Sequence, residues 1–199
     1  MARLTRAFYD RDPRELAPDL LNKVLVSTES GARVAARIVE VEAYRGSVDP
    51  ASHAYRGRTP RNATMFGRPG RLYVYFVYGM HWCANVVAAA PPDDAGAVLL
   101  RAATPLEGLD VMRSRRPAAR RDRDLCAGPA RLADAFGLDR AHDGADLVRG
   151  PFAIHDDGTP PPARPTRTTR VGLRAGRGDR ERLRWFVPGV ADVSAPKHR

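Results

Sequence analysis

Two glutamates and a tyrosine alternate along the segment Arg37-Ile-Val-Glu-Val-Glu-Ala-Tyr44. Successive side chains of a β-strand point to opposite faces, so Glu40, Glu42 and Tyr44 are predicted to share one face. Ile38 belongs to that same face, and the residues between them point to the core. A carboxylate beside an aromatic ring can act as a general base or stabilise a developing positive charge. Taken alone, the segment fits an ordinary amphipathic strand, with glutamates on its solvent-exposed face, better than it fits a catalytic site.

A second segment, residues 72–79, is rich in tyrosine and carries no formal charge. Tyr73 and Tyr75 share one face of the predicted strand, where Tyr73 fits a half-buried strand residue and a ligand contact equally well. Tyr78 breaks the alternation directly before Gly79. It is therefore predicted to project from a turn or bulge rather than from the regular sheet.

Arginine is concentrated in the long loop before this strand. Residues 56–71 contain no acidic residue and five arginines: Arg56, Arg58, Arg61, Arg68 and Arg71. Aromatic rings beside guanidinium groups suit a protein that stacks on bases and binds phosphates. Two further arginine groups lie within residues 113–123 and 164–184, and the first of these is interpreted as a solvated face.

The elements that must position these side chains follow from local patterns. Alternation and β-branched runs predict strands over residues 24–28, 34–44, 73–78, 97–102, 171–173 and 185–187. Capping residues and prolines predict helix starts at Asp12-Pro13, Thr104-Pro105 and Gly128-Pro129. Residues 156–170 are predicted to form a proline-rich surface loop. We expect one α+β domain over residues 1–199, a curved and mostly antiparallel sheet with surrounding helices and long loops.

The charge balance favours a polyanionic partner. The 199 residues include 33 basic and 23 acidic ones, a formal net charge of +10. Nucleic acid is the first candidate partner for such a chain. Only Lys23 and Lys197 are lysines, which is typical of GC-rich coding bias. That bias explains the preference for arginine over lysine, but it does not explain the excess of positive charge.

Several protein classes are disfavoured by composition. Cys83 and Cys126 are too few for a disulfide framework, and no Cys/His spacing fits zinc. The first residues lack the apolar stretch of a secretory signal. Residues 72–92 carry no charge, but their tyrosines, glycine and prolines predict strand, turn and strand rather than a membrane span. We expect an intracellular protein of the cytoplasm or nucleoid, a monomer without contact to a membrane.

Five strings, in this order and spacing, resemble the alkyladenine (3-methyladenine) DNA glycosylase family. They are residues 37–44, Thr59-Pro-Arg-Asn62, residues 72–80, residues 98–102 with Pro105-Leu-Glu-Gly108, and Leu125-Cys-Ala-Gly-Pro129. The resemblance runs from about Phe8 to the final strand, and the tail at 189–199 matches poorly. It implies a monofunctional DNA glycosylase of base excision repair that acts on double-stranded DNA. Such an enzyme flips alkylated or deaminated purines (3-methyladenine, 7-methylguanine, hypoxanthine) out of the duplex and hydrolyses the N-glycosidic bond, leaving an abasic site.

The resemblance also implies roles for individual residues, with no metal and no organic cofactor. Glu42 matches the general base that activates water, and Arg101 matches a residue that helps to hold this water. The residues that match the pocket around the flipped base are Tyr44, His53, Tyr75 and Asn85, with Asn85 on the pocket floor. Tyr78 matches the side chain that enters the minor groove and replaces the flipped nucleotide. We expect Arg56, Arg58 and Arg61 to contact the DNA backbone.

Two other classes of function stay open at this point. A non-catalytic nucleic-acid-binding protein would use the same arginines and tyrosines, but it needs no carboxylate such as Glu42 beside Tyr44. A metal-dependent nuclease would need a cluster of Asp, Glu and His that the sequence does not offer. Both lysines lie outside the five strings, which argues against a lyase that works through a Schiff base.

Overall fold

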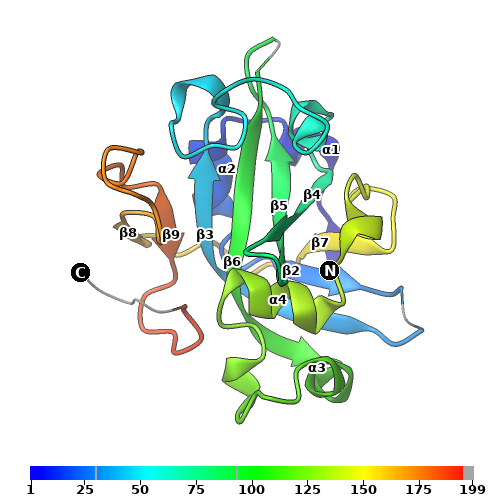
Figure 1. The fold of residues 1–199 in the computed structure, drawn as a ribbon. Helices are drawn as coiled ribbons and strands as arrows, with labels where there is room; N and C mark the ends of the chain where they lie inside the picture. The colour runs from blue at the N-terminus through cyan, green and yellow to red at the C-terminus, as the bar shows by residue number, and fades with distance from the viewer. Residues whose placement is uncertain (30, 93, 195–199) are drawn as a thin grey trace.

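One curled antiparallel sheet organises the chain, and β3 (Val34–Tyr44) and β6 (Gly96–Glu107) are its longest strands. The computed structural model describes residues 1–29, 31–92 and 94–194 (Figure 1). The strand order is β1-β7-β2-β3-β6-β5-β4, and β9 joins β3 to β8 at the side. The remaining strands are β1 (Ala2–Arg3), β2 (Val24–Ser27), β4 (Leu72–Val77), β5 (His81–Ala88), β7 (Phe152–Asp156), β8 (Thr166–Thr168) and β9 (Arg184–Phe186). The expected α+β class with an antiparallel sheet is confirmed.

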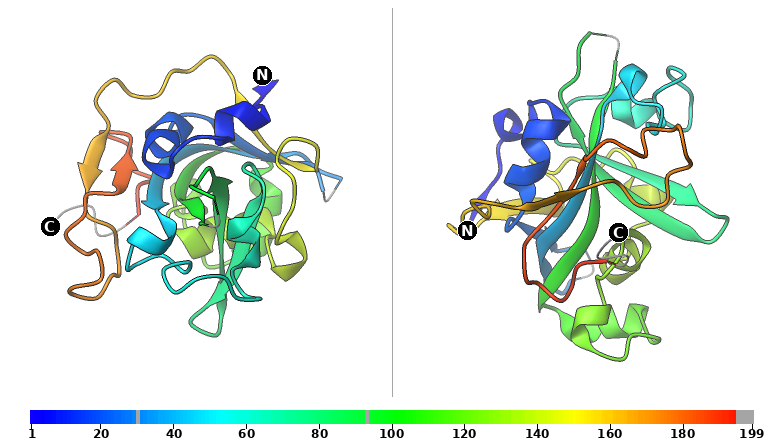
Figure 2. Two further views of the ribbon diagram at one scale, coloured as in Figure 1. Left: turned by 90° about the horizontal axis from the view of Figure 1, so that it is seen from above. Right: turned by 90° about the vertical axis from the view of Figure 1, so that its left-hand side faces the viewer.

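Four α-helices pack around the sheet in the described part of the chain. They are α1 (Arg6–Tyr9), α2 (Pro13–Leu20), α3 (Leu109–Arg115) and α4 (Pro129–Phe136). The predicted start of α2 is confirmed, because Asp12 accepts a hydrogen bond from the Arg14 N–H and Pro13 occupies the first turn. Gly137 ends α4 in the left-handed conformation. Figure 2 shows α1 and α2 on one side of the sheet and the β4–β5 hairpin projecting on the other.

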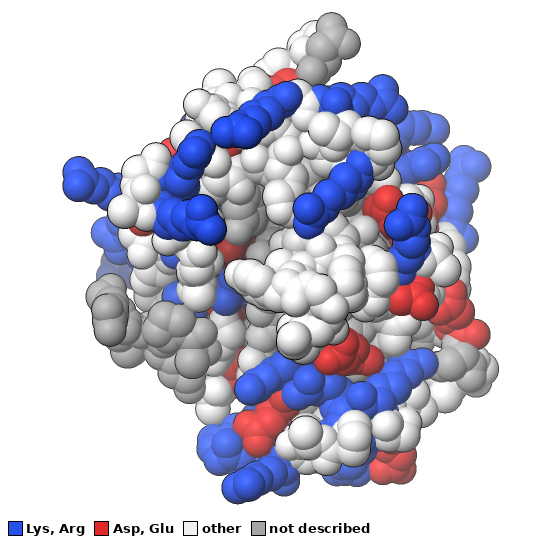
Figure 3. Space-filling model, in the orientation of Figure 1, with Lys and Arg blue, Asp and Glu red and all other residues white. Residues whose placement is uncertain are grey.

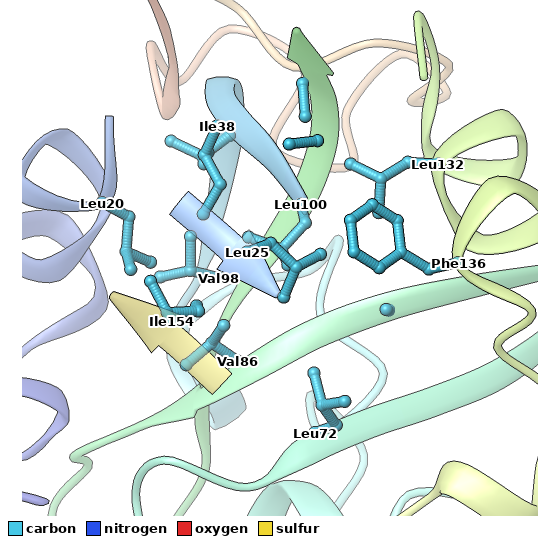
Figure 4. Close-up of a cluster of buried hydrophobic side chains, with 14 of the residues drawn as sticks. Leu20, Leu25, Ile38, Leu72, Val86, Val98, Leu100, Leu132, Phe136 and Ile154 are labelled. Atoms are coloured by element: carbon cyan, nitrogen blue, oxygen red, sulfur yellow. The ribbon is translucent and has the colours of Figure 1, made fainter. Parts of the chain in front are cut away.

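The main core joins the helices to the sheet. Figure 4 shows Leu20 of α2 and Leu132 and Phe136 of α4 around the strand residues Ile38 and Leu100. All five side chains are buried and belong to one hydrophobic cluster. Each contributes about 1.5–3 kcal/mol through removal of apolar surface from water. The β4–β5 hairpin and the long loops extend from this packed core.

A bulge changes the alternation in the strand that carries the glutamates. Ile38 pairs with Ala103 and Glu40 with Ala102, so Val39 is an extra residue in the register between β3 and β6. Ile38 therefore lies in the main core, and its predicted place beside Glu40 is wrong. One step further Val41 pairs with Leu100, which makes Arg101 the extra residue on β6. The two bulges leave the Glu40–Glu42–Tyr44 face intact and bring Arg101 to it.

The helix predicted at Thr104-Pro105 is absent, because these residues continue β6. Thr104 pairs with Arg37 and Pro105 with Ala36 across β3. Pairing of β6 with β5 stops at Leu99, so Pro105 lies where this side of β6 is no longer paired with β5. Proline is tolerated at such an edge because it has no N–H to donate. Helix α3 begins instead at Leu109, after a left-handed Gly108.

The C-terminal third also differs from expectation. The predicted loop at 156–170 contains strand β8, which pairs with β9, and it ends at a buried arginine, Arg170. The predicted strand at 171–173 is irregular, and the one at 185–187 corresponds to β9. Residues 195–199 of the poorly matched tail lie outside the described residues. Among the residues described, no helix has the length and apolar character needed to cross a bilayer.

Candidate active site

A cavity of about 230 Å³ lies between the β4–β5 hairpin, the loop after β3 and residues 171–173. Of the residues singled out from the sequence, those that line it are Tyr44, His53, Tyr73, Tyr75, Tyr78, Asn85 and Arg101. The cavity is smaller than the ~300–1,000 Å³ typical of ligand pockets. Its aromatic walls and small volume suit one flat ring system.

Glu42 lies directly behind the wall of this cavity. It is fully buried, and three groups that line the cavity surround its carboxylate. The Tyr44 hydroxyl donates to Oε2 at 2.9 Å and the Val171 N–H donates to Oε1 at 2.8 Å. Arg101 Nη1 lies 3.3 Å from the same Oε1. Two hydrogen bonds and a cation thus hold this carboxylate in place behind the cavity.

Tyr44 connects the carboxylate to the cavity. Burial, reinforced by the neighbouring Glu42, raises the pKa of its phenol well above the usual value. The hydroxyl therefore stays protonated and donates to Glu42. Arg170 stacks on the Tyr44 ring, with its guanidinium carbon 4.7 Å from the ring centroid.

Arg170 is a site residue that sequence reasoning missed. Its Nη1 and Nη2 donate to the two carboxylate oxygens of Asp49 at 2.5 and 2.8 Å, and both side chains are fully buried. Nη1 also donates to the Ala43 carbonyl oxygen at 3.0 Å. Burial opposes ionisation of Asp49, but the hydrogen bonds from Arg170 outweigh it and lower the pKa of this carboxyl. The only sequence signal is that Arg170 directly precedes Val171 in an arginine-rich stretch that looks like a surface.

His53 and two tyrosines form the opposite side of the cavity. The His53 ring meets Tyr75 edge-on, with centroids 4.5 Å apart, and its Nδ1 lies 2.9 Å from the Tyr73 hydroxyl. Tyr73 and Tyr75 stack at 5.4 Å. Desolvation of the ring where it packs against the tyrosines, together with the charge of Arg61, lowers the pKa of His53, although the residue as a whole is exposed. The imidazole is therefore neutral near pH 7 and presents an uncharged edge to the cavity.

The amide of Asn62 bridges the loop that carries His53. The Asn62 side chain donates to the carbonyl oxygens of His53 and Gly57 at 2.8 and 3.0 Å. Its own carbonyl oxygen accepts the Thr59 N–H at 2.6 Å. Asn62 is buried, and these three bonds explain why Thr59-Pro-Arg-Asn62 stands out as a motif.

Asn85 and Cys83 of β5 complete the wall beneath the tyrosines. Asn85 is buried and donates through Nδ2 to the Tyr73 carbonyl oxygen at 3.1 Å. This bond fixes the orientation of the amide. Burial raises the pKa of the Cys83 thiol to about 11, so it is neutral and serves as a small packing group.

Tyr78 stands at the tip of the β4–β5 hairpin. Its φ of 55° is left-handed, and Gly79 follows with φ 69°. The side chain is 81% exposed, and its neighbour Met80 is exposed as well. Figure 3 views the face onto which the hairpin projects, where Lys and Arg side chains surround an uncharged ridge with a hollow beside it. The expected projection from a turn is confirmed.

The first arginine group differs from the second in its partners. Arg56 and Arg58 are exposed, and neither has an ion-pair partner among the residues that the structure describes. Arg61 is exposed too and donates to the Phe76 carbonyl oxygen at 3.0 Å. Three members of the second group are paired with acids: Arg113 with Asp110 and Asp122, Arg116 with Asp134, and Arg121 with Asp124. Free positive charge is therefore available beside the hairpin, whereas much of the second group is neutralised.

Glu40 holds a buried polar network rather than facing the cavity. Arg101 Nε and Arg184 Nε both donate to its Oε1 at 2.7 Å. The Ser194 backbone N–H donates to Glu40 Oε2 at 2.6 Å, and the Ser194 hydroxyl donates to Oε1 at 2.9 Å. These contacts give Glu40 a structural role. Within the described residues, no three His, Cys, Asp or Glu side chains are placed to share a metal ion.

Known proteins to which this chain is similar carry names of DNA glycosylases. The family model described as methylpurine-DNA glycosylase matches residues 7–191. A Burkholderia lata protein provisionally named 3-methyladenine DNA glycosylase is 55% identical over 199 residues, which cover 98% of this chain and 93% of the relative. Similar proteins with the same provisional name come from Streptomyces avermitilis (47% identical over 195 residues, 96% and 90% covered) and Chlorobium phaeovibrioides (45% over 197 residues, 98% and 97% covered).

Proposed function

The chain belongs to the methylpurine-DNA glycosylase family, and on this premise we propose that it is a monofunctional DNA glycosylase that excises alkylated or deaminated purines. It would act as a monomer on double-stranded DNA, flip the damaged nucleotide and hydrolyse its N-glycosidic bond. The substrates in view are 3-methyladenine, 7-methylguanine and hypoxanthine. The product would be an abasic site with an intact phosphodiester backbone.

The observation that carries this proposal is a buried carboxylate behind an aromatic cavity. Glu42 is held by Tyr44, Val171 and Arg101, and all three border the space where a flat ring fits. As the bond between the purine nitrogen and C1′ breaks, positive charge develops on the sugar. Glu42 would stabilise this charge and accept a proton from the water whose oxygen bonds to C1′. The electron pair of the broken bond leaves with the purine.

The walls of the cavity support recognition of damaged purines. A flipped base would lie between Tyr44 on one side and His53 with Tyr75 on the other. N-alkylated purines carry positive charge, and tyrosine faces attract cations by about 0.5–2 kcal/mol. The neutral His53 imidazole adds no repulsion. Asn85 would filter purines through their exocyclic groups, because its amide is fixed at the cavity wall.

The surface around the cavity supports binding of duplex DNA. Tyr78 would enter the minor groove and occupy the gap left by the flipped nucleotide. Its left-handed backbone and its exposure allow the ring to stand away from the sheet. Arg56 and Arg58, free of acidic partners in the described structure, would neutralise phosphates next to it. Unstacking costs least at damaged or mismatched pairs, which supplies part of the selectivity.

The absence of lyase activity rests on the placement of the described lysine. Lys23, the residue before β2, is buried, and its Nζ lies 2.7 Å from Asp156 of β7 rather than at the cavity. A Schiff base with the abasic sugar would need an amine at the site. The chain should therefore release the base and leave the strand uncut.

The deciding experiment uses duplexes that each contain one damaged purine. We expect free base in the supernatant, and strand breaks only after alkali treatment converts the abasic sites. Tight binding without released base would favour the non-catalytic nucleic-acid-binding alternative. Strand breaks before alkali treatment would show lyase activity and contradict the monofunctional assignment.

A further inference from the structure

We infer that Ser194, in the C-terminal tail that the motif resemblance does not reach, is a positioning residue that orients Arg101 for base excision. The inference rests on the proposed function and deepens it. Ser194 does not border the cavity that receives the base. It would act on the reaction only through the arginine that lies beside Glu42.

The contacts of the Arg101 guanidinium divide between the network and the site. Nε donates to Glu40 Oε1 at 2.7 Å, and Nη2 donates to the Ser194 hydroxyl at 3.0 Å. This hydroxyl in turn donates to Glu40 Oε1 at 2.9 Å, so it accepts one bond and donates another. Nη1 is the nitrogen left to face Glu42, 3.3 Å from its Oε1. The bonds from Nε and Nη2 thus fix the direction in which Nη1 points.

Orientation matters for this arginine because its backbone lies in a bulge. Arg101 is the extra residue of β6 in its register with β3, so the regular ladder does not define its side-chain direction. Catalytic groups lose much of their effect when they move by about 1 Å. The network behind Arg101 supplies the constraint that the strand does not. Glu40, Glu42, Arg101 and Arg184 are all buried. Their formal charges, two negative and two positive, cancel.

The tail is anchored independently of the Ser194 hydroxyl. The Ser194 N–H donates to Glu40 Oε2 at 2.6 Å, and Arg184 Nη2 donates to the Ser194 carbonyl oxygen at 3.2 Å. Asp192 accepts the Thr104 hydroxyl at 3.0 Å, and Val193 is buried in a small cluster. Removal of the hydroxyl alone therefore leaves the tail in place. The role of the hydroxyl can be separated from the stability of the fold.

The test compares Ser194→Ala with Ser194→Thr, which restores a hydroxyl, and with Ser27→Ala as a matched control. Ser27 is a buried serine of β2, and its hydroxyl accepts only a long backbone bond from Glu29 at 3.4 Å among the described residues. We expect Ser194→Ala to slow single-turnover excision by about 10-fold, the scale of one lost bond to a charged group. Ser194→Thr should recover most of the rate, and Ser27→Ala should match wild type. Affinity for lesion DNA should be the same for both alanine variants, and urea unfolding should show that Ser194→Ala, although less stable through its lost buried hydrogen bonds, is fully folded under the assay conditions.

A double variant shows whether Ser194 acts through Arg101. In an Arg101→Gln background, Ser194→Ala should slow excision further by less than about two-fold, since the group that it positions is gone. An excision rate for Ser194→Ala equal to wild type would overturn the inference while leaving the proposed function intact. The same 10-fold loss in both backgrounds would also overturn it. A wild-type protein that releases no base would overturn the proposed function, and this inference with it.

Discussion

Replacing Arg170 by glutamine should destabilise the fold and slow excision, because one buried ion pair supports the back of the cavity. Arg170 makes two bonds to Asp49, a third to the Ala43 carbonyl oxygen and a stacking contact with Tyr44. Both charged side chains are fully buried. A glutamine keeps part of the volume but leaves the Asp49 carboxylate without a cation in a medium that solvates it poorly.

The magnitude follows from this burial. Loss of one partner of a buried ion pair costs about 3–5 kcal/mol, because the other charge remains uncompensated. The lost stacking on Tyr44 adds about 0.5–2 kcal/mol to the disturbance of the cavity wall. Adding Asp49→Asn to the Arg170→Gln variant should recover part of the stability, since no unpaired charge is then buried. Removal of both partners is thus expected to cost less than the sum of the two single changes.

Urea unfolding of the four proteins (wild type, two single variants and the double variant) measures these differences. Arg113→Gln is the matched control: its Nη2–Asp122 distance is 2.7 Å, but both side chains are half-exposed. It should unfold at the same urea concentration as wild type, since exposed pairs contribute little. A loss below about 1 kcal/mol for Arg170→Gln would refute the reasoning. So would strict additivity of the two single changes.

The same ion pair predicts how stability depends on pH. Because the pKa of Asp49 is lowered in the folded state, the pair contributes fully above the ordinary carboxyl pKa of about 4. Its contribution is lost as the pH falls from there through the lower native pKa. Wild type should therefore lose more stability than the double variant on acidification below about pH 4. Parallel pH profiles of the two proteins would contradict this assignment.

Three further changes test other parts of the site. Tyr78→Ala should shift base flipping back by about one to two orders of magnitude, the scale of one lost stacking contact, while Tyr78→Phe should be mild. Stopped-flow fluorescence of a base analogue measures this, and full flipping with slowed chemistry would place Tyr78 in the pocket instead. Arg58→Gln should flatten the log–log salt dependence of duplex binding by about one, and Arg113→Gln should not; equal slopes would move the footprint elsewhere. Asn85→Ser should raise excision of 7-methylguanine relative to hypoxanthine by roughly 1–3 kcal/mol in the measured rate ratio, and an unchanged ratio would mean that Asn85 does not filter purines.

Elements with strong local signals are predictable from the sequence, and elements decided by distant pairing are not. Asp12-Pro13 and Gly128-Pro129 start helices because a proline in the first turn, joined by the Asp12 cap in α2, acts locally. Thr104-Pro105 carries a similar local signal, yet pairing with β3 keeps it in a strand. The bulge at Val39 is hidden because apolar residues occupy both phases of the alternation around it. Patterns within a few neighbouring residues carry no information about these contacts between distant parts of the chain.

The site divides in the same way. Glu42, Tyr44 and the hairpin tyrosines stand out through alternation and the motifs. Arg170 and Ser194 do not, because their partners lie 121 and 154 residues away in the sequence. Arg170 looks like one of many surface arginines, and Ser194 sits in a tail without a motif. Only the folded chain shows that both groups stand behind the residues that line the cavity.

The central claim is that Glu42 is the base that activates water, and one variant tests it most directly. Glu42→Gln keeps the size of the side chain but removes its charge and its ability to accept a proton from water. Single-turnover excision from a duplex with one alkylated purine should fall by at least about 100-fold, the usual contribution of a general base. Affinity for the same duplex should stay within a few-fold of wild type. A variant that retains more than about a tenth of the wild-type rate, a loss under about 1.4 kcal/mol, would contradict the assignment.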